Sequence, residues 1–295
     1  MNNNFETVKC NFCSSDNYKV VYIKEGFNIV KCNKCGLVYV NPRLSQTAIN
    51  KLYDDDYFTG KGFDKSVQYE DEFLTESQKT TLSDWDVSTI KSFVNNQSNN
   101  TLSLLDVGCG MGLFLLKANK QNFNSQGLEL SSFAVNFAAS KGLNVQNNSV
   151  FSNSLKENSY NVISLKEVIE HLPDPKAAFK TVYNLLLPDG LLFLTTGNYN
   201  CPERKLRGAD WFYFMPKGHL FIFSPKTIYN FLKEAGFSKI IITNQGDLLM
   251  NFLLKFNIIE PDKYKPKNPL KRIIFEIVRL INHFISSGMR IYAIK

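Results

Sequence analysis

The chain has 295 residues, of which 44% are hydrophobic and 21% charged, an ordinary composition with room for one large domain and a smaller one. No run approaches the roughly 18 to 20 apolar residues of a membrane span, and the first residues lack a secretory pattern, so we expect a cytoplasmic protein. Most of the net charge of +7 lies in residues 255–295, which contain nine Lys or Arg and three acids. The near-neutral remainder argues against nucleic acid as the main partner.

Four of the six cysteines open the chain in a pattern typical of a zinc ribbon. The two C-x₂-C pairs, separated by 18 residues, are formed by Cys10, Cys13, Cys32 and Cys35. Apolar and polar residues alternate sufficiently in the segments 18–23 and 27–30 to predict two short antiparallel strands. A module of about 40 residues needs a metal for folding energy, so we predict structural Zn²⁺ within residues 1–44. Disulfides are the alternative, which a cytosolic location disfavours.

A glycine-rich turn follows the apolar run that ends at Asp106. The pattern over 102–118 predicts a strand, a tight turn and a helix. The turn holds three alternate glycines, Gly108, Gly110 and Gly112. Glycine lets the backbone approach a ligand closely, and the next helix points its free N–H groups at the turn. A dinucleotide fingerprint would need glycine where the chain has Leu113.

These residues resemble motif I of the class I methyltransferases that depend on S-adenosylmethionine (SAM). Three further blocks match in order: Glu129 at the end of a second strand, 160–175 with an E-H-L-x-D-P turn, and 185–196 with a Pro-Asp-Gly turn. The resemblance implies a loop around the methionine part of SAM and a Glu129 carboxylate on the ribose hydroxyls. The cofactor site it implies consists of Asp106, Gly108, Cys109, Gly110, Gly112, Glu129, Leu130 and Lys166.

The chain departs from that family at two places. Asn161 stands where the family often has Asp, at the start of the fourth strand. The family often has an acid near the end of the third strand to hold the adenine amine, whereas residues 146–151 contain none. Asn148, or the backbone at Val150 and Phe151, is the substitute that we expect.

A zinc ribbon followed by 36–43 and a SAM core resembles a bacterial subgroup of methyltransferases associated with sugar and surface-polysaccharide modification. The resemblance implies a helical lid with its linker over 45–100. The tyrosine-rich stretch 52–58 belongs to this lid. Tyr57 either closes over SAM or the acceptor, as a candidate catalytic residue, or packs between helices.

Histidine is the side chain best suited to remove a proton from a hydroxyl acceptor near neutral pH. His171 follows the fourth strand, at the edge where α/β sheets bind ligands. His219 lies in the aromatic segment 211–224, which suits an acceptor pocket. Both are candidate general bases, with His219 favoured, and both can equally be structural. His283 lies in a predicted helix and has no assigned role.

The end of the chain completes the predicted sheet. Residues 224–235 are expected to form a helix that Gly236 terminates, followed by a strand at 237–243. Residues 289–294 form the last strand, antiparallel to it. Between them, 269–286 forms an amphipathic helix that packs on the core, joins a dimer or makes weak contact with a membrane surface.

The predicted fold is α/β: a Rossmann-like, seven-stranded SAM methyltransferase core with an N-terminal zinc ribbon and a helical lid. The predicted domains are the ribbon at 1–44, the lid at 45–100, the core at 101–246 and the helix with the last strand at 247–295. We expect a monomer or homodimer that methylates a sugar hydroxyl on a small molecule, with C- or N-methylation of a similar small molecule left open. An RNA base methyltransferase and a non-catalytic ribbon protein with a degenerate core are the alternatives.

Overall fold

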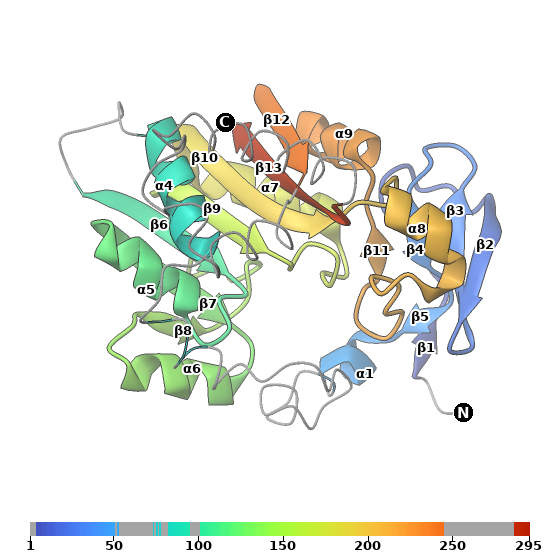
Figure 1. Ribbon diagram of the computed structural model, residues 1–295, viewed down its shortest axis with the longest axis horizontal. Helices are drawn as coiled ribbons and strands as arrows, with labels where there is room; N and C mark the ends of the chain where they lie inside the picture. The colour runs from blue at the N-terminus through green and yellow to red at the C-terminus, as the bar shows by residue number, and fades with distance from the viewer. Residues whose placement is uncertain are drawn as a thin grey trace, which may run out of the picture.

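The computed structural model describes residues 4–50, 52, 73, 75, 77, 82–94, 101–244 and 286–295. Within them a seven-stranded sheet has the order β12-β13-β10-β9-β6-β7-β8 (Figure 1). Its strands are β6 (Leu102–Val107), β7 (Phe123–Glu129), β8 (Val145–Asn147), β9 (Tyr160–Lys166), β10 (Leu186–Gly197), β12 (Lys239–Asn244) and β13 (Gly288–Ile294). Only β13 runs antiparallel, against both β10 and β12. The predicted Rossmann-like, seven-stranded sheet is confirmed.

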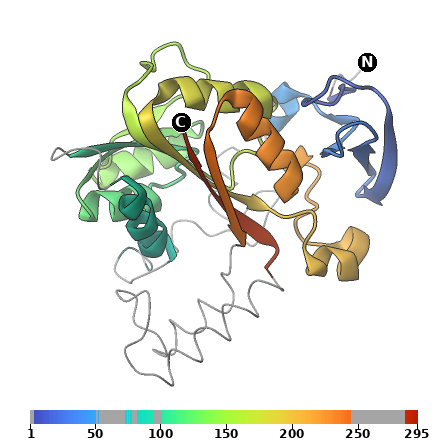
Figure 2. The ribbon, with the colours of Figure 1, turned by 90° about the horizontal axis from the view of Figure 1, so that it is seen from above.

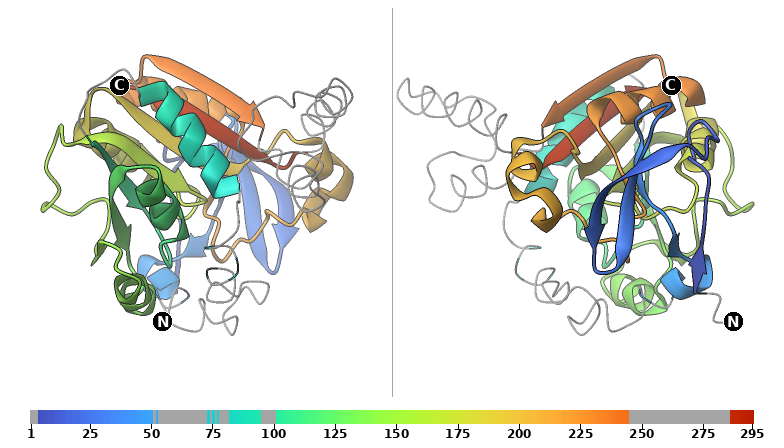
Figure 3. Two further views of the ribbon diagram at one scale, coloured as in Figure 1. Left: turned by 60° about the vertical axis from the view of Figure 1, so that its left-hand side comes forward. Right: turned by 90° about the vertical axis from the view of Figure 1, so that its right-hand side faces the viewer.

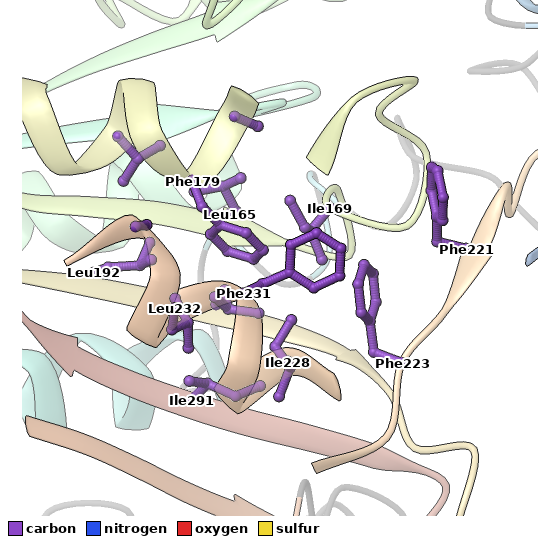
Figure 4. Packing of buried hydrophobic residues seen from close by; sticks show 14 of the residues in the cluster. Leu165, Ile169, Phe179, Leu192, Phe221, Phe223, Ile228, Phe231, Leu232 and Ile291 are labelled. Atoms are coloured by element: carbon purple, nitrogen blue, oxygen red, sulfur yellow. The ribbon is translucent and has the colours of Figure 1, made fainter. Parts of the chain in front are cut away.

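Helices cover both faces of this sheet, as Figures 2 and 3 show. They are α4 (Leu82–Val94), α5 (Leu113–Lys120), α6 (Ser132–Ser140), α7 (Pro175–Leu185) and α9 (Pro225–Ala235). Successive strand residues point to opposite faces, so Ile163 and Leu165 pack with α7 and α9, whereas Val162 packs with α4 and α5. Figure 4 shows Leu165 beside Phe179 of α7 and Phe231 of α9. Because both faces are covered, the central strands are almost continuously apolar.

The helix ends follow local sequence signals. Ser224 caps α9, where its hydroxyl accepts from the Thr227 amide and Pro225 occupies the first turn. Gly236 ends the helix with a left-handed φ of 115°. The predicted helix with its terminal glycine is therefore confirmed. Asp174 caps α7 in the same way, with Pro175 in the first turn.

The ribbon forms a second sheet, of order β11-β4-β3-β2. Its strands are β2 (Tyr18–Lys24), β3 (Phe27–Cys32), β4 (Val38–Val40) and β11 (Phe221–Ile222). The two strands predicted between the cysteine pairs are confirmed as β2 and β3. The fourth strand, β11, comes from the segment after His219, and Figure 1 shows it beside β4. One hydrophobic cluster runs from the ribbon into the core, so the two parts pack as neighbours.

Short elements join these parts. They are α1 (Gln46–Asn50), α8 (Pro202–Arg207), the 3₁₀ turn η1 (Gly208–Asp210), and a two-stranded sheet of β1 (Phe5–Glu6) and β5 (Arg43–Leu44). Tyr57, the linker 95–100 and nearly all of the predicted amphipathic helix 269–286 lie outside the described residues. Among the helices that the structure describes, none has the length and apolar character needed to cross a bilayer.

Candidate active site and cysteine cluster

Asp106 ends β6 at the carboxyl edge of the sheet, where parallel α/β sheets bind ligands. Its buried carboxylate accepts a hydrogen bond from Ser164 Oγ at 2.6 Å, which joins β6 to β9. Burial raises the pKa of Asp106 to about 7. The side chain therefore ties the strand that leads into the glycine turn to β9.

The glycines of the turn are required by packing as well as by backbone conformation. Gly108 and Gly112 have φ of +67° and +85°, which L side chains rarely adopt. A Cβ at Gly108 would lie 2.6 Å from Val168 Cγ2, and a Cβ at Gly112 would lie 2.5 Å from Leu143 Cδ1. The turn thus sits directly against the segment that follows β9. Cys109 is buried beside Gly127 and forms part of this packing.

The Glu129 carboxylate binds the same turn from the end of β7. It accepts hydrogen bonds from the amides of Gly110 at 3.0 Å, Leu130 at 2.7 Å and Ser131 at 3.0 Å. Burial raises its pKa, and these three N–H donors oppose that shift. A carboxylate in this place can exchange a backbone partner for ribose hydroxyls.

Two apolar side chains near Glu129 are exposed: Leu130 at 61% and Phe151 at 40%. The amide of Asn148 donates to the Glu129 carbonyl at 3.1 Å, which holds the 148–151 segment next to the end of β7. The segment predicted to contact adenine therefore lies next to Glu129 in the fold.

Lys166, at the end of β9, is directed toward α4. Its Nζ lies 3.3 Å from Asp86 Oδ2 and 4.6 Å from the centre of the Phe114 ring. Arg290 of β13 shares Asp86 at 2.8 Å. Lys166 therefore anchors α4 over the sheet, close to the predicted cofactor turn.

The structure brings His171 and His219 together at this edge. Their ring centres lie 4.7 Å apart in an edge-to-face arrangement. His171 Nδ1 lies 3.0 Å from the Gly218 carbonyl, and His219 Nδ1 lies 2.7 Å from the Tyr213 carbonyl. A carbonyl only accepts, so each Nδ1 carries the proton and each Nε2 keeps a lone pair. Burial lowers the pKa of both rings, which keeps them neutral.

Two glutamates and a tyrosine complete the cluster, and sequence reasoning did not select them. Tyr213 Oη contacts a Glu170 oxygen and lies 3.0 Å from Glu167 Oε2. Thr196 Oγ1 donates to the other Glu170 oxygen at 3.1 Å. Desolvation of its carboxyl group, followed by the charge of Glu170, raises the pKa of Glu167 to about 8, and the residue as a whole is exposed. The sequence signal that could have found them is the pair of acids Glu167 and Glu170, three residues apart and just after a strand.

Glu167 also has an unusual backbone, with φ of 52°. A non-glycine residue in the left-handed region is strained and concentrates at functional sites. Its amide donates to the Thr195 carbonyl at 3.1 Å, and this bond holds the strained turn against β10. The turn from Glu167 to His171 is therefore fixed by β10 on one side and the glycine turn on the other.

The four ribbon cysteines converge on one point. One sulfur atom from each of Cys10, Cys13, Cys32 and Cys35 lies within 4.8 Å of the other three. The Cys10–Cys35 and Cys13–Cys32 sulfur distances are 3.4 and 3.5 Å, far beyond the roughly 2.05 Å of a disulfide. Four sulfurs at such separations fit a single tetrahedral ion.

Comparison with known proteins agrees with this geometry. A family model described as a methyltransferase domain matches residues 78–241. A phosphoethanolamine N-methyltransferase of Arabidopsis thaliana is 24% identical over 250 residues, which cover 79% of this chain and 50% of that protein. A ubiquinone biosynthesis O-methyltransferase of Pasteurella multocida (strain Pm70) is 30% identical over 148 residues, 43% of this chain and 61% of that protein. The chain thus spans about half to three fifths of these relatives.

The fold is similar to that of solved methyltransferase structures. The crystal structure of a SAM-dependent methyltransferase from Archaeoglobus fulgidus superimposes with a TM-score of 0.51 and 18% identity, covering 77% of this chain and all of that one. At this identity the similarity concerns the fold alone. The family match covers more than half of the chain, including the glycine turn, Glu129 and the Glu167–His171 segment.

Proposed function

The chain belongs to the methyltransferase-domain family, and on this premise we propose that it transfers a methyl group from SAM to a hydroxyl group of a small molecule, with a sugar as the favoured acceptor. The observation that carries the proposal is the neutral His171–His219 pair beside the glycine turn. The sugar assignment rests on the resemblance of the ribbon, lid and core arrangement to sugar-modifying enzymes. The near-neutral charge of residues 1–254 favours a small acceptor over RNA.

The residues present fit SAM. The glycine turn and the free amides of α5 suit its methionine part, Glu129 suits the ribose hydroxyls, and Leu130 with Phe151 suits the adenine faces. When bound, SAM supplies an electrophilic methyl group on a sulfonium. The protein aligns the acceptor oxygen with that methyl group and provides a group to take the hydroxyl proton.

Proton removal is assigned to the His171–His219 pair. Both Nδ1–H groups donate to backbone carbonyls, so Nε2 is the ring atom of each histidine that can take up a proton. The pair lies one turn of chain from Val168, which packs against Gly108. An acceptor hydroxyl at the pair would therefore lie next to the cofactor turn.

The ribbon is proposed to hold one structural Zn²⁺ through Cys10, Cys13, Cys32 and Cys35. The converged sulfurs support this assignment. The first knuckle also contacts the catalytic side of the core: Asn11 Nδ2 donates to Asp174 Oδ1 at 2.9 Å, and the Phe12 ring lies 4.9 Å from that of Phe231. A zinc-ordered knuckle would thus brace the turn that carries His171.

Methyl transfer to defined acceptors tests the proposed function. The protein is incubated with SAM and, separately, a nucleotide-linked sugar panel, a phenol panel and a primary-amine panel, with methylated products identified by mass spectrometry. A methylated sugar hydroxyl supports the proposal. Methylation confined to amines or phenols would exclude the sugar assignment, and no methylation of any panel would argue against the hydroxyl assignment.

The Glu129→Ala variant tests the predicted SAM site. Removal of a charge-assisted partner of the ribose is expected to cost about 1–3 kcal/mol of SAM affinity by calorimetry. Glu157→Gln, an exposed glutamate on a loop, should bind SAM normally. Unchanged SAM affinity in a folded Glu129→Ala protein would remove the ribose assignment.

A further inference from the structure

Helix α8 and the edge of the ribbon sheet beside it present several cations to solvent. Arg204 of α8 donates from Nη1 to Tyr22 Oη at 2.9 Å, which holds the helix on β2. Figure 1 shows α8 next to the ribbon strands. We call this face of the molecule the basic surface, and it comprises Lys19, Lys31, Arg204, Lys205 and Leu206.

Two cations of the basic surface lie on the ring of one tyrosine. Arg204 Cζ is 4.2 Å and Lys31 Nζ is 5.5 Å from the centre of the Tyr199 ring. Lys19 stands directly opposite Lys31 in the β2–β3 pair, an arrangement of like charges that destabilises a sheet. Within the described part of the chain, none of these three cations forms an ion pair with a carboxylate. An anion bound beside them would relieve the repulsion between them.

The acids of α8 and η1 do not neutralise the basic surface. Glu203 is already engaged, because it pairs with Arg207 at 2.8 Å and also contacts Ser287 Oγ. Asp210, at the end of η1, is exposed. Lys205 is exposed too, and no carboxylate of the described residues lies within ion-pair distance of it. The basic surface therefore keeps an excess of positive charge.

A leucine is exposed among these charges. Leu206 lies between Lys205 and Arg207 and is 88% exposed, the largest value among the large apolar side chains of the described residues. Phe212, just after η1, is 58% exposed. A single exposed leucine is ordinary on a protein surface. Apolar side chains flanked by lysine and arginine, however, are typical of segments that lie in a membrane interface.

A second basic stretch of the chain ends at the same place. Residues 255–285 contain seven Lys or Arg and three acids in sequence. The chain that follows them is fastened to α8 and its neighbours at Ser287. Its Oγ contacts Glu203 and accepts a hydrogen bond from Trp211 Nε1 at 3.3 Å, and its carbonyl accepts from the Asn198 amide at 2.7 Å. The positive charge of residues 255–285 therefore joins the described chain beside the basic surface.

We propose that the basic surface binds the anionic face of a lipid bilayer, with lipid phosphates beside Lys19, Lys31 and Arg204 and with Leu206 among the headgroups. Each lysine or arginine close to such a membrane adds to the attraction. The exposed leucine adds burial of apolar area, which a nucleic-acid backbone does not offer. The protein then docks on a membrane surface through α8 and the ribbon.

Cosedimentation with vesicles tests the basic surface. The protein is mixed, without SAM or acceptor, with vesicles of phosphatidylglycerol and phosphatidylcholine or of phosphatidylcholine alone. We expect binding to the anionic vesicles only, and this binding should weaken as salt is added. Lys19→Glu with Lys205→Glu should weaken it at least about tenfold, and Leu206→Ser should weaken it several-fold. Lys156→Glu with Lys226→Glu, two exposed lysines outside the basic surface, is the charge-matched control and should retain most of the binding.

Circular dichroism confirms that each variant is folded. No binding to anionic vesicles, or equal weakening in the two lysine double variants, overturns the basic surface as a membrane site. Binding of a single-stranded RNA in place of vesicles, weakened by the same substitutions, also overturns it and assigns the cations to nucleic acid. Because SAM and acceptor are absent from the assay, failure to bind vesicles leaves the proposed methyl transfer standing, and failure of methyl transfer leaves the basic surface standing.

Discussion

His171 and His219 lie edge to face at 4.7 Å, although one follows β9 and the other precedes β11. The backbone explains their proximity: the Glu170 carbonyl accepts hydrogen bonds from the amides of Leu220 at 2.8 Å and Phe221 at 3.2 Å. These bonds join the turn after β9 to the strand that completes the ribbon sheet. Ribbon, core and histidine pair therefore meet at one place.

His171→Ala and His219→Ala are each expected to lower turnover on a hydroxyl acceptor by roughly a hundredfold to ten-thousandfold, the usual contribution of proton removal. SAM affinity should change little, because the cofactor contacts are predicted to come from the glycine turn and Glu129. Single-turnover rates and calorimetry on the same preparations separate these effects. Near-native rates in both variants would assign proton removal to another group.

One zinc per chain is expected in protein purified without added metal, and Cys13→Ser should lose it. Because Asn11 and Phe12 pack on the start of α7 and on α9, the loss should also lower turnover. Metal analysis measures the zinc content, thiol titration shows whether the cysteines are disulfide-bonded, and an activity assay measures turnover. Less than half an equivalent of metal, together with disulfide-bonded cysteines, would contradict a structural site.

Gly108→Ala is expected to destabilise the protein more than Gly142→Ala does. Both glycines have positive φ, which costs about 1 kcal/mol with alanine, but only Gly108 meets a neighbour, Val168 Cγ2 at 2.6 Å. Overpacking adds about 1–3 kcal/mol. Chemical denaturation measures the difference, and Val168→Ala should remove part of it. Equal losses at the two glycines would show that packing does not constrain the turn.

Asp106→Asn is expected to stabilise the ligand-free protein at pH 8 by about 2–4 kcal/mol, since a pKa raised from 3.8 to about 7 reflects a costly buried carboxylate. The folded state binds the proton more tightly than the unfolded state, so wild-type stability rises as the pH falls from 7 toward 4. The advantage of the variant should therefore shrink between pH 8 and pH 5. An advantage that is the same at both pH values would contradict the raised pKa.

Local patterns in the sequence were sufficient for much of the fold. The glycine turn, the helix from 224 to Gly236, and the strands between the cysteine pairs depend on neighbours in the chain, and the structure confirms them. The seven-stranded sheet with an antiparallel last strand followed from the order of such elements and from the family resemblance. The roles of Asp106, Glu129 and the cysteines remain predictions, which the geometry supports.

The acid–histidine cluster was decided only by tertiary structure. Tyr213 reaches Glu167 and Glu170 because β11 pairs with β4 of the ribbon and thereby positions the segment before it. A two-residue strand has no periodicity to reveal it, and its partner β4 lies far from it in the sequence. Contacts of this kind arise from long-range packing, which residue type and spacing do not encode. The sequence by itself determined the glycine turn and the cysteine pairs, whereas the folded chain determined which acids and histidines lie together at the end of β9.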